Sequence, residues 1–140
     1  FSTSYVYPGT KGNYKENDPL LPVNNYAWSK LGGEASVQLY KNSLILRICM
    51  TEKPFVHKTA FSNIQLSFMY QDEVVKILPK LLNKKGIINV GGNKQSPYEF
   101  AKKNNKNVEK TFFSYNKYKI KMPKDSSMNV NKLRKILKKK

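Results

Sequence analysis

The stretch YAWSKLGGEASVQLY, residues 26–40, is followed by SLILRIC, residues 43–49, and this pair of segments decides the fold class. In the first segment Leu31, Ala35 and Leu39 recur at helical spacing. The second segment is a short, almost continuous apolar run, which is typical of a strand buried on both faces of a parallel sheet. A helix that leads into such a strand forms an α/β unit. We therefore predict an α/β fold built around a parallel sheet.

The residues before this unit predict a strand, or the end of one, and a long loop. Residues 1–7, FSTSYVY, alternate apolar and hydroxyl side chains and are rich in residues that favour strands. Residues 8–24 are rich in proline and glycine, which predicts a loop. A loop of this length in a compact domain is often functional. Asn25 is placed to cap the helix predicted at 26–40.

The residues after this unit predict a second buried strand and three further helices. GIINV, residues 86–90, is a short apolar run closed by two glycines. The apolar spacing of residues 71–82 predicts a helix that Pro79 splits, because proline lacks a backbone N–H. Ser96 begins a capping pattern for a helix at 97–103. A last amphipathic helix carries its apolar residues at Val130, Leu133, Ile136 and Leu137.

Composition excludes several classes of protein. The chain has 140 residues, of which 39% are hydrophobic and 12% aromatic, so it can bury a core and is not disordered as a whole. No apolar run approaches the roughly 18 residues of a membrane span. A single cysteine, Cys49, excludes an internal disulfide framework and a multi-cysteine zinc site, and we expect no metal. No charged-then-apolar leader opens the chain, so we expect a cytoplasmic protein.

The net charge of +17 raises the question of a nucleic-acid partner. However, 24 of the 26 basic residues are lysine, and only Arg47 and Arg134 have the planar fork that reads bases and clamps phosphates. The lysines are spread along the chain, and asparagine is enriched with them, as the codon bias of an AT-rich genome produces. We therefore expect a solvated lysine-rich surface and no nucleic-acid partner, with polyanion binding as an open alternative.

Tyr26 and Lys30 stand four residues apart at the start of the predicted helix, which places them on one face, a turn apart. A lysine ammonium beside a phenol favours the phenolate and lowers its pKa from about 10. A tyrosine tuned in this way can donate a proton to a carbonyl oxygen, or accept one from an alcohol, near neutral pH. The spacing alone is a weak signal, because a chain this rich in tyrosine and lysine produces such surface pairs by chance.

Other features have ordinary structural interpretations. His57 is the only histidine and is expected to be exposed rather than to serve as a metal ligand or base. Cys49 ends an apolar strand, so we expect a small buried residue rather than a nucleophile. Trp28 is expected to pack against the neighbours of its helix. Gly32 and Gly33 weaken that helix locally and are expected to permit close packing against a neighbour.

Four segments occur in an order that is specific when they are taken together. They are STSYVY at 2–7, GTKG at 9–12, ENDPLLP at 16–22 and YAWSKLGGE at 26–34. This order resembles the extended short-chain dehydrogenase/reductase family, and within it the dTDP-4-dehydrorhamnose reductase group of nucleotide-sugar enzymes. GIINVGG at 86–92 and PKDSSMNVNKLRKIL at 123–137 look like the end of that family's substrate domain. The resemblance covers nearly the whole chain and is densest up to Arg47.

The resemblance implies a role for each residue that matches the family's motifs. Tyr26 matches the catalytic acid/base, and Lys30 matches the residue that lowers its pKa and holds the nicotinamide ribose. Thr3 matches the hydroxyl that hydrogen-bonds the reacting carbonyl oxygen, so two donors would converge where hydride attack places negative charge. The cofactor implied is NADP or NAD, bound in part by Tyr26 and Lys30, and the partner implied is a nucleotide-linked sugar.

Further residues are expected to bind the substrate together with Thr3. Ser4 stands where the family often has Asp, which changes the contacts to the hydroxyls of the sugar. Met50 falls near a family Trp that packs on the sugar, so stacking departs from the pattern there. Thr3 and Tyr5 are two residues apart on the first predicted strand and therefore share one of its faces. One face of that strand is expected to border the active site.

The resemblance also implies how the chain is divided. Residues 1–50 would form the catalytic end of a Rossmann-like domain, and residues 51–140 would form most of a small α/β substrate-binding lobe. The family's dinucleotide-binding strands would precede Phe1, and no Gly-x-x-Gly-x-x-Gly phosphate loop occurs in this chain. We therefore expect a fragment whose N-terminal half is absent or is supplied by a partner chain, and which does not turn over alone.

These features predict an NAD(P)-dependent reductase of a nucleotide-linked 4-keto sugar. An epimerase of the same superfamily is an alternative, because epimerases share the Tyr/Lys chemistry. A non-catalytic regulatory or binding module is a second alternative. A homodimer is compatible with the sequence, and the residues that select NADH or NADPH would lie before Phe1.

Overall fold

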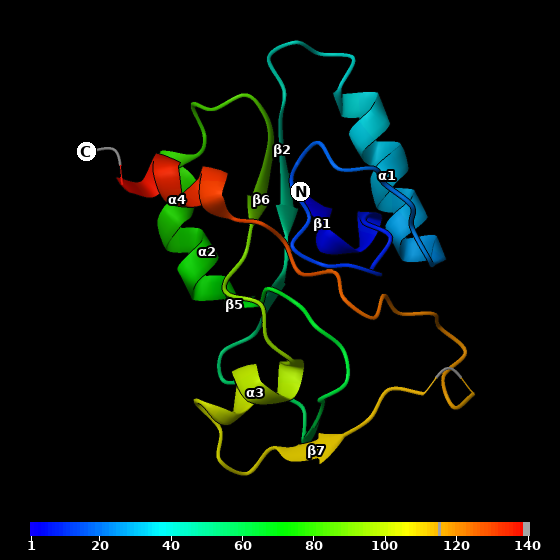
Figure 1. Ribbon diagram of the computed structural model, residues 1–140. Coiled ribbons are helices and arrows are strands. Elements are labelled where there is room, and N and C mark those ends of the chain that lie inside the picture. Colours follow the sequence, from blue (N-terminus) through cyan, green and yellow to red (C-terminus); the bar gives the residue numbers. More distant parts are fainter. Residues whose placement is uncertain (115, 139–140) are drawn as a thin grey trace.

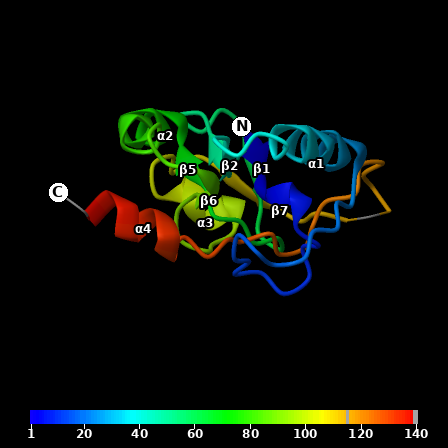
Figure 2. The same cartoon turned by 90° about the horizontal axis from the view of Figure 1, so that it is seen from above.

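A three-stranded parallel sheet lies at the centre of the computed structural model, which describes residues 1–114 and 116–138 (Figure 1). The strand order is β1-β2-β6, which confirms the predicted α/β fold class. The strands are β1 (Ser2–Thr3), β2 (Leu44–Ile48) and β6 (Gly86–Val90). Helix α1 (Asn25–Val37) packs beside β1, and α4 (Asn131–Lys138) packs against β6. The two helices lie on opposite sides of the molecule in both views (Figures 1 and 2).

A smaller group of elements extends below the central sheet in Figure 1. Strand β3 (Met50–Thr51) pairs in parallel with β5 (Met69–Tyr70). Helix α2 (Gln71–Ile77) follows β5 directly but returns to the level of the central sheet, where it lies beside α4 (Figures 1 and 2). Strand β4 (Thr59–Phe61) pairs in parallel with β7 (Glu109–Thr111), next to α3 (Pro97–Lys102). This part has an apolar cluster of its own, built from Phe55, Ala60, Ala101 and Val108. The division of the chain near residue 50 remains a prediction.

Several local predictions are confirmed. The second buried strand has the predicted bounds, 86–90. Pro79 lies in a 3-10 helix, Leu78–Lys80, that follows α2, so the predicted split is present. The hydroxyl of Ser96 accepts a hydrogen bond from the backbone N–H of Glu99, whose carboxylate in turn accepts one from the backbone N–H of Ser96 at 2.8 Å. This reciprocal pair caps α3 as its sequence predicts.

Of the two predictions for residues 1–7, the end of a strand is confirmed and a strand over the whole segment is wrong. Only Ser2 and Thr3 pair with β2, and Ser4–Val6 form a 3-10 helix. The hydroxyl of Thr3 accepts a hydrogen bond from the backbone N–H of Tyr5 at 3.3 Å, which ends the extended conformation and begins the turn. The alternating pattern of residues 1–7 did not indicate that the Thr3 hydroxyl would bind a backbone N–H that a longer strand would use for pairing.

Helix α1 differs from its prediction at both ends. Its cap is Asn24 rather than Asn25, because the side chain of Asn24 accepts the backbone N–H of Ala27 at 2.9 Å. The helix ends at Val37 and not at residue 40. Trp28 is 53% exposed, so the prediction that it packs against the neighbours of the helix is wrong.

The two glycines of α1 do not have the predicted close neighbour. A Cβ atom at Gly32 or Gly33 would meet no other atom of the described chain within 4 Å. The prediction of close packing therefore fails among residues 1–114 and 116–138, and the helix keeps two glycines that nothing there requires.

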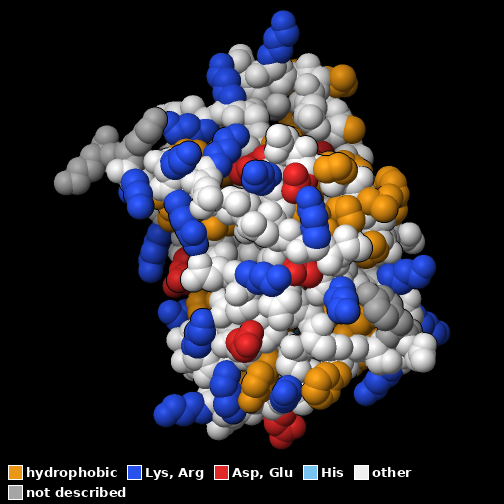
Figure 3. All heavy atoms as spheres, in the orientation of Figure 1, with side chains coloured by type: hydrophobic (Ala, Val, Ile, Leu, Met, Phe, Trp, Pro, Cys, Tyr) orange, Lys and Arg blue, Asp and Glu red, His pale blue; other side chains and the backbone are white. Residues whose placement is uncertain are grey.

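The surface is rich in lysine, as the composition predicts. Lysine side chains are scattered over the face shown in Figure 3 rather than gathered in one patch. Every described lysine except Lys30 is exposed, whereas Lys30 is half-buried. The position of Lys30 is therefore unusual within this chain.

A buried ion pair joins α1 to β2. The guanidinium of Arg47 donates two hydrogen bonds to the carboxylate of Glu34, at 2.7 and 2.9 Å, and both side chains are at most 2% exposed. The hydroxyl of Ser2 donates to the same carboxylate, which brings in β1. The guanidinium also donates to the hydroxyl of Tyr7 and to the backbone carbonyl of Glu16, each at 2.9 Å. Burial opposes the charge on Arg47, but hydrogen bonding to Glu34 and contact with Tyr7 outweigh it and raise its pKa.

Asn89 extends this network into β6. Its side-chain oxygen accepts the hydroxyl of Tyr7 at 2.8 Å, and its side-chain nitrogen donates to the carbonyl of Tyr14 at 2.9 Å. Its backbone N–H donates to the carboxylate of Glu16 at 3.1 Å. Asn89 is fully buried, so these partners replace water. Part of the long loop at 8–24 is thus fixed to the middle of the sheet and has a structural role.

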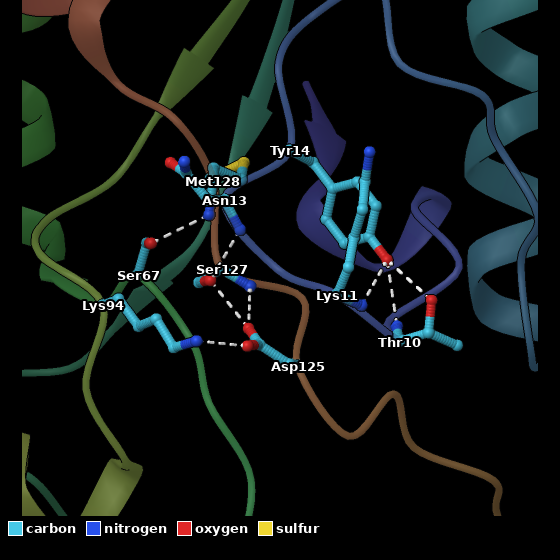
Figure 4. Close-up of polar contacts among 9 residues, drawn as sticks. All are labelled: Thr10, Lys11, Asn13, Tyr14, Ser67, Lys94, Asp125, Ser127 and Met128. Carbon is cyan, nitrogen blue, oxygen red and sulfur yellow. Dashed lines mark hydrogen bonds and ion pairs between the residues drawn. The ribbon is translucent and has the colours of Figure 1, made fainter.

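A second part of that loop packs against residues near the C-terminus (Figure 4). The carboxylate of Asp125 accepts hydrogen bonds from the backbone and hydroxyl of Ser127 and forms an ion pair with Lys94. Gly12 has a φ of +68°, and a Cβ there would lie 2.3 Å from the Asp125 carboxylate, so only glycine fits. The backbone N–H of Asn13 donates to the hydroxyl of Ser127 at 2.9 Å. Two segments that are distant in the sequence therefore support one another.

We expect Arg47→Met to lower the free energy of unfolding by about 3–5 kcal/mol, because it leaves the buried Glu34 carboxylate without its ion-pair partner. Denaturant titration measures this change. Lys76→Met on α2 is the control, since the Lys76–Asp72 pair is exposed and should contribute less than about 1 kcal/mol. Equal effects of the two substitutions would show that the Glu34–Arg47 pair does not hold α1 on the sheet.

Candidate active site

A cleft of about 370 Å³ opens where β1 and β2 end. All six residues proposed from the sequence line this single cleft: Thr3, Ser4, Tyr5, Tyr26, Lys30 and Met50. In α/β sheets with parallel strands, ligands bind outside the carboxyl ends of the strands. The structure thus brings together residues that are up to 47 positions apart in the sequence, at the edge of the sheet where a ligand is expected.

Each polar residue of the cleft is placed by a local structural feature. Thr3 ends β1, and the 3-10 helix that follows turns Ser4 and Tyr5 along the wall of the cleft. Tyr26 lies in the first turn of α1, directly after the Asn24 cap, and Lys30 lies one turn further on. No hydrogen bond or ion pair engages the Lys30 side chain among the described residues. Its ammonium group is therefore available to a ligand.

Two buried groups beside these residues are poor acids. Burial is the main cause that raises the pKa of Tyr5 above its usual value, with smaller contributions from Cys49 and Tyr26. The rings of Tyr5 and Tyr26 meet edge to face, with centroids 6.5 Å apart. Burial also raises the pKa of Cys49 to about 11, although hydrogen bonds from Ser67 and Ser4 oppose it. Cys49 is 5% exposed, which confirms the prediction of a small buried residue.

Sequence reasoning missed Phe68, which also lines the cleft. The β3–β5 ladder pairs Met50 with Met69, so the residue before Met69 comes to lie beside Met50. The ring of Phe68 is half-buried and packs against Phe100 at 5.5 Å between centroids. Met50 itself is 42% exposed. The cleft therefore has an aromatic wall close to the position where the resemblance places a tryptophan, but it is contributed by the residue just before β5.

A wider groove of about 690 Å³ continues from the cleft past Tyr5 and Tyr26, which line both. Its other wall carries Lys119 and Lys121, next to the partly buried Met122. The side chain of Asn24 donates to the carbonyl of Lys121 at 2.8 Å and so holds this wall against the start of α1. Together the two spaces are large enough for an extended ligand.

The described residues contain no group of three or more metal-ligating side chains. His57 is exposed, as predicted, and its ring contacts only Phe55 among the aromatic neighbours described. In the same part of the chain, no helix has both the length and the apolar composition needed to cross a membrane.

Comparison with known proteins agrees with this geometry. The family model described as RmlD substrate binding domain matches residues 1–79, which is more than half of the chain. The chain belongs to this family. The resemblance to the dTDP-4-dehydrorhamnose reductases is thereby confirmed, and it includes every residue that we place in the cleft.

Individual relatives extend the comparison to the rest of the chain. A dTDP-4-dehydrorhamnose reductase of Burkholderia thailandensis is 55% identical over 38 residues, which is 26% of this chain and 13% of that protein. A hypothetical dTDP-4-dehydrorhamnose reductase from Sulfolobus tokodaii has a TM-score of 0.78 and 33% identity, covering 98% of this chain and 57% of that one. The reductase of Bacillus anthracis, solved in complex with NADP, has a TM-score of 0.80 at 24% identity over 95% of this chain and 57% of its own, and shows the fold alone. The chain thus spans little more than half the length of these neighbours.

We expect the thiol of Cys49 to react slowly with iodoacetamide. With a pKa of about 11, the folded thiol is ionised about a hundredfold less at about pH 8 than a thiol with a pKa near 9. Alkylation followed by mass spectrometry should therefore be at least about a hundredfold slower in the folded chain than in the chain unfolded by denaturant. Comparable rates would show an accessible, reactive thiol and would reopen the possibility of a nucleophilic role.

Proposed function

We propose that this chain is the catalytic and substrate-binding part of an NAD(P)-dependent reductase that acts on a nucleotide-linked 4-keto sugar. The observation that carries the proposal is the convergence of Thr3, Tyr26 and Lys30 in one cleft at the carboxyl end of a parallel sheet. Membership of the RmlD substrate binding domain family, together with the similarity to dTDP-4-dehydrorhamnose reductases, supports the same reaction class.

In this proposal Tyr26 is the acid that protonates the carbonyl oxygen of the sugar, and Thr3 donates a second hydrogen bond to that oxygen. Both donors lie where negative charge develops during reduction, and fixed donors stabilise such charge more than water does. In this proposal Lys30 is the positive charge beside Tyr26, because its ammonium is half-buried and has no carboxylate partner among the described residues. Bound NADP or NAD would supply the hydride.

The residues fit one end of a nicotinamide cofactor. Lys30 and Tyr26 lie side by side along the cleft, and the free ammonium of Lys30 suits the hydroxyls of the nicotinamide ribose. The chain has no glycine-rich turn leading into a helix to hold a pyrophosphate. The proposal therefore assigns the pyrophosphate site to an N-terminal half or a partner chain.

The sugar and the nucleotide are assigned to the two connected spaces. The sugar would lie in the cleft against Met50 and the Phe68 ring, with the hydroxyls of Ser4 and Thr3 on the polar side. The diphosphate and base would extend into the groove between Tyr26 and the lysines at 119 and 121. Amines on this wall suit a diphosphate, since a lysine ammonium binds phosphate as a point charge.

One structural neighbour keeps the epimerase alternative open. The UDP-glucuronic acid 4-epimerase of Bacillus cereus has a TM-score of 0.75 and 21% identity, so it shares the fold alone. The reductase is favoured because the relative with 55% identity over 38 residues and the neighbour with 33% identity both carry that name. A non-catalytic binding module is the other alternative, and loss of turnover on changing Tyr26 distinguishes it.

We expect Tyr26→Phe to lower kcat at least about a hundredfold, because the carbonyl oxygen loses its proton donor. The assay joins the chain, at Phe1, to the dinucleotide-binding part of a reductase and follows NADPH consumption with dTDP-4-dehydrorhamnose. Tyr40→Phe is the control, because Tyr40 is 73% exposed and lies outside the cleft. An active fusion in which both substitutions have the same small effect would contradict the role of Tyr26. A correctly folded fusion with no turnover would favour the binding module.

We expect Phe68→Ala to weaken binding of dTDP-rhamnose about tenfold, because a sugar ring would lose its aromatic contact. Calorimetric titration of the fusion measures the Kd, and thermal unfolding checks that the variant is folded at the titration temperature. Phe112→Ala is the matched control, since Phe112 is 60% exposed and does not line the cleft. Equal Kd values for the two variants would remove Phe68 from the substrate site.

A further inference from the structure

A polar pocket of about 520 Å³ lies beside the start of α4, next to the segment that follows β6. Three segments that are far apart in the sequence line it: Asn13, residues 92–94, and residues 127–131 with Arg134. Figure 4 shows a residue from each segment, Asn13, Lys94 and Ser127, close together. None of the lining residues also lines the cleft or the groove of the candidate active site. The proposed reaction therefore leaves this pocket without a use.

The described lining of the polar pocket is rich in amides and contains no carboxylate. Asn13, Asn93, Asn129 and Asn131 all contribute to it. The side-chain oxygen of Asn129 accepts the backbone N–H of Asn131 at 3.1 Å, and that of Asn93 accepts the guanidinium of Arg134 at 2.7 Å. No hydrogen bond within the described chain engages the side-chain nitrogens of Asn93 and Asn129. These nitrogens are therefore free to donate to the oxygens of a ligand.

Arg134 brings an unpaired positive charge to this pocket. The chain has 24 lysines and two arginines, and the other arginine, Arg47, is committed to the buried pair with Glu34. Arg134 lies in the first turn of α4 and forms no ion pair with any described residue. Its contact with Asn93 fixes the guanidinium across the pocket and leaves further N–H groups free. A guanidinium fork held in this way suits a phosphate, to which it can donate two parallel hydrogen bonds.

Lys94 supplies a second positive charge in a fixed position. Its ammonium lies 2.5 Å from the carboxylate of Asp125, which also accepts hydrogen bonds from the backbone and hydroxyl of Ser127 (Figure 4). The side chain of Asp125 is 12% exposed and does not line the pocket, whereas that of Lys94 is 51% exposed and does. Two cations beside one carboxylate leave an excess of positive charge, so the pocket favours an anion.

We infer that the polar pocket is a second ligand site, which binds a small phosphate ester that carries hydroxyl groups, as a sugar phosphate does. Arg134 and Lys94 would hold the phosphate, and the amides of Asn93 and Asn129 would donate to the hydroxyl oxygens. The volume favours an ester, since a free phosphate ion would fill only a small part of about 520 Å³. The inference rests on this pocket alone and does not depend on the proposed reductase activity.

Calorimetric titration of the 140-residue chain with glucose 1-phosphate tests the assignment, with inorganic phosphate and glucose as reference probes. We expect glucose 1-phosphate to bind at least about tenfold more tightly than either reference, because only the ester engages both the cations and the amides. Its binding should also slow the amide hydrogen exchange of residues 127–134. Equal affinities for the two phosphates would overturn the assignment to an ester. Slowing confined to residues 25–37 would place the ligand in the active-site cleft and overturn the location.

We expect Arg134→Gln to weaken the binding of glucose 1-phosphate about tenfold or more, because the phosphate loses its guanidinium partner. Lys135→Gln is the matched control, since Lys135 is the next residue of α4, is exposed, carries the same charge and does not line the pocket. It should leave the affinity within about twofold of the unsubstituted chain. Thermal unfolding checks that both variants are folded at the titration temperature. Equal effects of the two substitutions would show that binding follows the overall charge, and would overturn the site. Binding is measured without NADPH or a keto sugar, so failure of the proposed reductase activity would leave this result intact.

Discussion

The bidentate contact between Glu34 and Arg47 determines how α1 lies over the sheet. The carboxylate of Glu34 accepts hydrogen bonds from the hydroxyl of Ser2 in β1 and from the guanidinium of Arg47 in β2. The charged groups of Glu34 and Arg47 are both buried away from water. A buried ion pair is tolerated only when its hydrogen bonds are satisfied, so this contact permits one rotation of the helix about its axis. Tyr26 and Lys30 stand two turns and one turn before Glu34 on the same helix face. Fixing Glu34 therefore also directs these two residues toward the end of β1.

The cleft is positively charged because Lys30 lines it and no described carboxylate lines it with Lys30. No carboxylate lines the cleft within the described part of the chain, and Ser4 stands where the related enzymes often have an acid. The half-buried ammonium of Lys30 thus dominates the local field, reinforced by the net charge of +17. Such a field attracts anionic ligands. The scattered surface lysines strengthen it from a distance.

Periodicity and spacing predicted the buried strands, the capping box at Ser96 and the split at Pro79, because each depends on residues close in sequence. The sequence also named six candidate site residues, and the structure brings all six to one cleft, although their roles remain predictions. The 3-10 turn after Thr3 escaped prediction, since a single hydroxyl-to-backbone contact overrides the strand pattern. Phe68 and the Arg47–Glu34–Asn89 network also escaped, because only the β3–β5 pairing and the sheet register bring these residues to their partners. The sequence offered one signal for this network: a charged residue, Arg47, within the apolar run SLILRIC, where a buried charge needs a partner.

Helix α1 links the chemistry of the cleft to the surface behind it. Phe1, Ser2 and Lys30 line both the cleft and a smaller space of about 160 Å³ between β1 and α1, so these spaces share a wall. The side chain of Lys30 therefore belongs to the walls of both spaces, and its position depends on how α1 packs beside β1.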